Sequence, residues 1–81
     1  MSGGYFEYQQ FHINDIAESL ERLIKEPPES FGEETINRFK TGLDIIKLSY
    51  VYTQRIDWLM SGDDDEESFH RRLQEDIAKL I

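Results

Sequence analysis

The 81-residue chain contains no cysteine and only two prolines. Without cysteine, neither a disulfide framework nor a thiolate zinc site can stabilise the fold. No apolar run approaches the roughly 20 residues that span a bilayer. The first residues also lack the basic and apolar segments of a secretory signal. We therefore expect a cytoplasmic protein with no membrane segment, stabilised by helix packing or by self-association.

Basic residues are also scarce, with nine Lys and Arg against seventeen Asp and Glu and a net charge of −8. This charge repels phosphate, so we expect no binding to nucleic acid. The acidic residues are interspersed with Arg and Lys. That distribution favours a role in solubility over an acidic face that imitates nucleic acid.

The longest regular segment runs from Glu33 to Met60, with no proline and with Gly42 as its one glycine. Ser30 and Glu33 are spaced as a capping box, which predicts that a helix begins there. Apolar residues recur at three- and four-residue spacing in two stripes, so the helix is expected to contact more than one neighbour. The first stripe comprises Ile36, Phe39, Leu43, Ile46 and Tyr50, and the second comprises Ile45, Leu48, Tyr52, Ile56 and Leu59.

Gly42 destabilises a helix interior relative to alanine, so its presence needs a reason. We interpret it as a small residue at which another helix crosses closely. Gly62, after Ser61, is expected to end the long helix, because glycine adopts the left-handed conformation at little steric cost.

A shorter helix is predicted before the long one, over about 13–26. Asn14 or Asp15 is its expected cap. Pro27 and Pro28 end it, because a proline pair cannot continue a helix.

A third helix is predicted over about 64–80, after an acidic run that complements the positive end of the helix dipole. Asp63 or Asp64 is its expected cap. With the long helix over 31–61 and short connections between the helices, the prediction is a single all-α domain over 1–81. It is a three-helix antiparallel arrangement, preceded by an aromatic-rich segment over 1–12. The long helix overhangs its neighbours and leaves apolar surface uncovered, so we expect a homo-oligomer.

Patterns typical of catalysis or metal binding are missing or incomplete. The acidic run resembles the start of an EF-hand loop, but Ser68 replaces its glycine and Gln74 replaces its last glutamate. His12 and His70 have no third ligand in their sequence context. There is no glycine-rich phosphate loop and no G-x-S-x-G motif. We predict a non-enzymatic protein without metal or cofactor.

The candidate binding residues are aromatic and basic side chains from the N-terminal segment and from the corner between the long and the last helix. One interpretation is structural: Trp58 is wedged between helices, and Asp57 or the acidic run pairs with the arginines. The other is a pocket in which aromatic rings stack on a planar ligand and arginines bind an anion. The candidate residues are Tyr5, Tyr8, Tyr52, Arg55, Trp58, Arg71 and Arg72.

Three segments carry a resemblance to a known group of proteins: Met1–Phe6, Ile13–Glu18 and Gln54–Phe69. They resemble small phage and prophage proteins of unassigned function. Asp65 stands where that pattern has glycine. The resemblance covers most of the chain and implies a context, the cytoplasm of a bacterial host, without residue roles.

Two functional hypotheses follow from that context. The first is a phage-type accessory protein that binds a host defence or regulatory protein non-covalently and inhibits it. The second is an oligomeric sponge that sequesters a small nucleotide signal, with tyrosines and arginines at the interface between copies.

Overall fold

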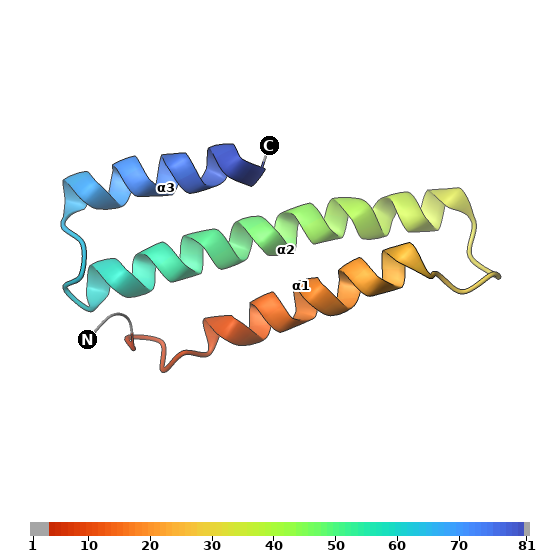
Figure 1. The fold of residues 1–81 in the computed structure, drawn as a ribbon, viewed down its shortest axis with the longest axis horizontal. Coiled ribbons are helices and arrows are strands. Elements are labelled where there is room, and N and C mark those ends of the chain that lie inside the picture. The colour runs from red at the N-terminus through yellow and green to blue at the C-terminus, as the bar shows by residue number, and fades with distance from the viewer. Residues whose placement is uncertain (1–3, 81) are drawn as a thin grey trace.

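The computed structural model describes residues 4–80, which form three α-helices: α1 (Gln10–Lys25), α2 (Glu33–Met60) and α3 (Glu66–Leu80). Met1–Gly3 of the opening motif and Ile81 lie outside the described residues. Figure 1 shows α1 and α3 on opposite sides of α2, each antiparallel to it. The predicted all-α, three-helix antiparallel arrangement is confirmed. None of the helices in residues 4–80 is both long and apolar enough to cross a bilayer.

The three helices lie in a single layer with α2 in the middle. Within residues 4–80, α2 packs against both α1 and α3, whereas α1 and α3 make no contact with each other. The chain measures 48 × 24 × 13 Å, so its shortest dimension is about one helix diameter. Both broad faces of the layer are therefore open, and Ala17 is the one buried apolar residue among those described.

The predicted start of α1 is wrong. The helix begins at Gln10, and Asn14 and Asp15 lie inside it. Gln9 is the N-cap, and its side chain makes no capping bond. The preceding segment is already a series of turns, in which the Phe11 N–H donates to the Tyr8 carbonyl at 3.2 Å. Backbone bonds of this kind satisfy the first N–H groups, so no capping side chain is needed.

The predicted capping box of α2 is also wrong. The helix begins at Glu33 after Gly32, with no side-chain cap. Ser30 belongs to a turn in which the Phe31 N–H donates to the Pro28 carbonyl at 3.1 Å. The Phe31 ring packs edge-on against Phe39, with centroids 6.0 Å apart, and this contact fixes the loop against the helix.

Gly62 ends α2 as predicted, with a φ of 85°. The cap of α3, however, is Asp65 rather than Asp63 or Asp64. The Ser68 N–H donates to Asp65 Oδ1 at 2.8 Å, and the Asp65 N–H donates to Ser68 Oγ at 3.1 Å. This reciprocal pairing satisfies two backbone donors at once, which makes Asp65 the best-placed cap in the acidic run.

Candidate functional site

The N-terminal hook, residues 4–9, is held against α2 by the carboxylate of Asp57. Asp57 is fully buried. Its Oδ1 accepts a hydrogen bond from the Phe6 N–H at 2.9 Å, and its Oδ2 accepts one from the Gly4 N–H at 3.1 Å. A buried carboxylate is destabilising unless donors surround it. The hook supplies these donors, so Asp57 and the hook depend on each other.

The hook backbone is strained at two consecutive positions. Glu7 has a φ of 57° and Tyr8 a φ of 63°. Both values lie in the left-handed region, which is unfavourable for residues other than glycine. Each such residue costs on the order of 1–3 kcal/mol. Two backbone turns support the conformation: Glu7 N–H donates to the Gly4 carbonyl, and Gln9 N–H donates to the Phe6 carbonyl, both at 3.1 Å.

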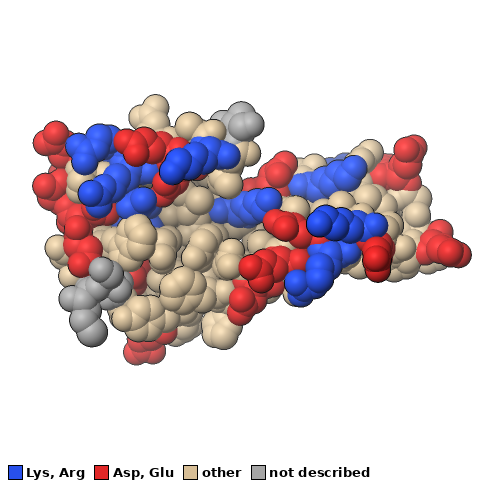
Figure 2. Space-filling view, viewed as in Figure 1, with Lys and Arg blue, Asp and Glu red and all other residues tan. Residues whose placement is uncertain are grey.

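Aromatic rings of the hook and of the first turn of α1 lie in solvent. Tyr8 is 46% exposed and Phe11 is 44% exposed. Their rings are nearly parallel, with centroids 6.2 Å apart, and Phe11 lies 6.4 Å from the half-buried Tyr50. We call these three residues the aromatic cluster. Figure 2 shows an uncharged area at this end of the molecule, bordered by acidic and basic side chains.

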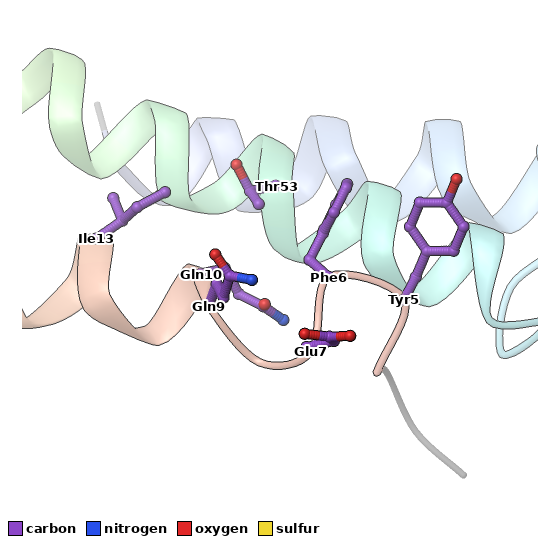
Figure 3. A pocket seen from close by; sticks show the side chains of 7 residues that line it. All are labelled: Tyr5, Phe6, Glu7, Gln9, Gln10, Ile13 and Thr53. Carbon is purple, nitrogen blue, oxygen red and sulfur yellow. The ribbon is translucent and has the colours of Figure 1, made fainter.

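Tyr5 belongs to a different part of the hook. Its ring contacts Phe6 edge-on at 5.1 Å and remains 54% exposed. It borders an open hollow of about 590 Å³ between the hook, α1 and α2 (Figure 3). No Lys or Arg lines this hollow, so it offers no positive charge to an anion. Its lining residues are Tyr5, Phe6, Glu7, Gln9, Gln10, Ile13 and Thr53.

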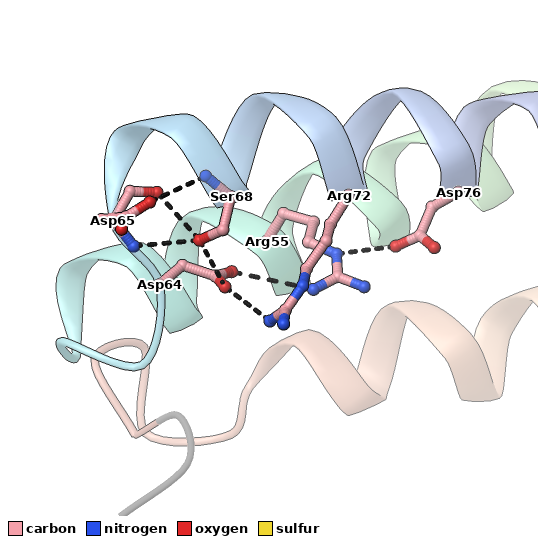
Figure 4. Close-up of polar contacts among 6 residues, drawn as sticks. All are labelled: Arg55, Asp64, Asp65, Ser68, Arg72 and Asp76. Atoms are coloured by element: carbon pink, nitrogen blue, oxygen red, sulfur yellow. Dashed lines mark hydrogen bonds and ion pairs between the residues drawn. The ribbon is translucent and has the colours of Figure 1, made fainter.

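The predicted corner between α2 and α3 contains a network of ion pairs (Figure 4). Arg55 Nε lies 2.7 Å from Asp76 Oδ2, and its Nη1 lies 3.7 Å from Asp64 Oδ2. Arg72 Nη1 lies 2.7 Å from Asp64 Oδ1. The Arg55 guanidinium also sits over the Trp58 ring, 4.6 Å from its centroid. Both guanidiniums are therefore already neutralised by carboxylates of the same chain.

The seven predicted site residues do not form one site. Arg55, Trp58 and Arg72 meet at the corner, while Tyr5 and Tyr8 lie on the hook. Tyr52 is on another side of α2, and Arg71 is exposed. Its positive charge contributes to lowering the pKa of the Asp65 carboxyl, after the hydrogen bonds from Ser68.

Sequence reasoning missed the anchoring role of Asp57. It expected that Asp57 or the acidic run would pair with the arginines, and Asp64 of the acidic run does so. A signal was present, because an aspartate in the last turn of a helix opposes the negative end of the dipole. Such a residue needs other donors, and here they come from a segment more than 50 residues away in sequence.

Two side chains in these regions, Asp65 and Tyr50, have pKa values that differ from their ordinary values. The backbone N–H and then the hydroxyl of Ser68 donate to Asp65, which lowers the pKa of that carboxyl. Burial raises the pKa of the Tyr50 hydroxyl above its ordinary value. Both shifts follow from the local packing.

No group of three or more His, Asp or Glu side chains within residues 4–80 is placed to hold a metal ion. His12 and His70 are both exposed, and His70 lies edge-on to Phe69 at 5.2 Å. Comparison of the chain with protein-family models, with curated proteins and with solved structures gave no match.

Proposed function

We propose that this chain is a phage-type accessory protein that works by non-covalent binding, and that it inhibits a host defence or regulatory protein. The observation that carries the proposal is the fixed conformation of the hook. A buried carboxylate and two strained residues hold it so that Tyr8 stacks on Phe11 in solvent. Packing these rings inward would stabilise the chain by the hydrophobic effect.

Rings fixed in this way suit protein recognition. Tyrosine is enriched among the residues that dominate binding energy, because it combines a large apolar ring with a polar tip. Ordering a flexible segment on binding lowers affinity, and a hook that is already ordered avoids that loss. The net charge of −8 further favours a partner with a basic surface, whose approach it would accelerate.

The nucleotide-sponge hypothesis has less geometric support. It needs cations that can bind phosphate, yet Arg55 and Arg72 already pair with Asp64 and Asp76. A phosphate at this corner would have to displace those carboxylates. The hollow beside Tyr5 has no basic lining residue to replace them.

The test compares Tyr8→Ser with Phe31→Ser, which removes a similarly exposed ring at the opposite end of α2. Both variants are checked for helix content by circular dichroism. We expect one host protein to co-purify with the wild type and with Phe31→Ser, and Tyr8→Ser to weaken its binding at least ~10-fold in calorimetry with the purified partner.

Native mass spectrometry of the gently purified protein separates the two hypotheses. A chain that carries no small ligand, alone or in complex with the host protein, supports the protein-inhibitor proposal. An additional mass of a few hundred daltons that Arg55→Ala removes, with no protein partner, would contradict it and support the nucleotide sponge.

A further inference from the structure

The chain exposes more surface than a folded monomer of its size should. Its accessible area is 6075 Å² for a mass of 9.6 kDa, whereas packed monomers of this mass expose about 5,100 Å². The radius of gyration is 15.2 Å, against about 12 Å for a compact chain of this length. The excess area of roughly 1,000 Å² is close to what one partner buries in a stable dimer, about 800 Å².

The excess follows from the single layer. Domains usually bury a core between two packed layers of secondary structure, whereas this chain forms only one layer. Of the two broad faces, the one shown in Figure 2 carries Lys, Arg, Asp and Glu side chains along α2 and α3. The ion pair between Lys47 and Glu21, 3.1 Å long, ties α2 to α1 on one side of the layer.

The side opposite Lys47 is apolar. Tyr50 contacts α1 and Arg55 contacts α3. At about 100° per residue, Ile56 lies about 100° from Arg55, about 120° from Tyr50 and about 180° from Lys47 around α2. Ile56 therefore points to neither neighbour and away from the ion pair, and it is 37% exposed.

Ile45 and Tyr52 share this direction and are 62% and 42% exposed. On α1, the exposed side chains Ile16 and Leu23 lie about 140° and 160° from Glu21, on the same broad side of the layer. We call this surface, formed by Ile16, Leu23, Ile45, Tyr52 and Ile56, the apolar face.

Gly42 provides a second, independent observation. Apart from its two chain neighbours and the backbone of its own helix, no atom lies within 4 Å of the place where its Cβ would be. No other element of the described chain therefore makes the close approach that the sequence predicted there. Gly42 lies on the same seam as the apolar face: positions 42, 45, 49, 52 and 56 alternate three- and four-residue steps. That repeat is the spacing by which one helix packs along another.

From these observations we infer that the apolar face binds a second copy of this chain, with α2 of one copy packed against α2 of the other about a twofold axis. The seam is self-complementary, because the small residues Gly42 and Ser49 alternate with Ile45, Tyr52 and Ile56. A twofold axis near Ser49 sets Gly42 of one copy opposite Ile56 of the other. The seam carries no charge, so two copies that each bear −8 can meet there without apposing acids.

The test is the mass in solution, measured by sedimentation equilibrium between about 1 and 100 µM. We expect twice the 9.6 kDa chain mass, or an even multiple of it, for the wild type. Ile45→Lys is expected to weaken self-association at least ~100-fold, since it places a charge in each half of the interface. Leu80→Lys, a matched change at an exposed leucine away from the seam, is expected to leave the mass unchanged.

Gly42→Leu keeps the test decisive if Ile45→Lys fails to fold. Leucine favours the helix and meets open space in the single chain. The variant is therefore expected to keep its helix content while its mass falls to that of one chain. A wild type that stays monomeric at 100 µM, or a dimer that survives both seam variants, would overturn the inference. The mass of the chain in solution is independent of whether Tyr8→Ser weakens binding to the host protein, so the two proposals can fail separately.

Discussion

The buried carboxylate of Asp57 accepts hydrogen bonds from the backbone N–H groups of Phe6 and Gly4, which lie 51 and 53 residues earlier in the chain. One side chain at the end of α2 thus fixes the position of the N-terminal hook. Because the hook carries Tyr8, the presentation of the aromatic cluster depends on a residue that is not part of it.

Asp57→Ala is expected to release the hook. The change leaves two backbone N–H groups without their acceptors, which costs about 1–3 kcal/mol of unfolding free energy when the donors stay buried. Hydrogen exchange should show faster exchange at the Phe6 amide, and thermal denaturation should show a lower Tm. Asp15→Ala, an exposed aspartate on α1, serves as control. Unchanged exchange at Phe6 would show that the hook does not need the carboxylate.

Arg72 and Arg71 are adjacent but are expected to differ in importance. Arg72→Ala removes the 2.7 Å partner of the buried Asp64 carboxylate. Because the Arg72 side chain is 46% exposed, we expect a discounted loss of about 1 kcal/mol, measured by urea denaturation. Arg71→Ala should stay within about 0.5 kcal/mol of the wild type. Equal losses in the two variants would argue against the ion-pair network as the source of stability.

The cap of α3 predicts a specific acid response. The pKa of Asp65 is lowered in the folded chain, by the Ser68 N–H first. Because the pKa is lower in the folded chain, the ionised Asp65 cap contributes its full stabilisation of the fold above the unfolded pKa of about 3.9. This contribution is lost as the pH falls through the folded pKa. Asparagine caps without titrating. The Tm difference between wild type and Asp65→Asn should therefore change between neutral pH and pH 2, and a constant difference would contradict the assignment.

Burial raises the pKa of Tyr50. The resulting stabilisation is therefore lost at high pH, whereas that of the Asp65 cap is lost at low pH. The neutral phenol is favoured in the folded chain, so this stabilisation is intact below the unfolded pKa of about 10. It is lost as the pH rises through the folded value. A spectrophotometric titration of the wild type should show a late phenolate step that is missing in Tyr50→Phe. Persistence of that step in the variant would assign it to another tyrosine.

Sequence reasoning predicted the helices better than their ends. The two apolar stripes of α2 correctly indicated more than one neighbour, since a stripe of Ile36 and Leu43 and a stripe of Leu48 and Leu59 cannot both face one helix. The ends depend on local competition. Three consecutive aspartates could cap α3, and Asp65 does so because Ser68 stands three residues after it.

The arrangement of the candidate site could not be predicted from local patterns. Tyr5 and Tyr8 are close in sequence, yet left-handed backbone at Glu7 and Tyr8 separates their surroundings. The pairing of Asp57 with the hook is a long-range contact between two segments that share no periodicity. Helical spacing determines which residues of one helix share a face, but it does not show which distant backbone groups a buried carboxylate will meet.

The order of synthesis gives the Asp57 anchor a further consequence. The aromatic hook is synthesised before its anchor, which follows 51 residues after Phe6. At about 5–20 residues per second, that interval lasts roughly 3–10 s. Throughout this interval the Asp57 carboxylate is not available to accept hydrogen bonds from the Gly4 and Phe6 N–H groups. In a nascent chain the hook is therefore not yet held by Asp57. The surface that we propose for partner recognition is complete only once the last turn of α2 has formed.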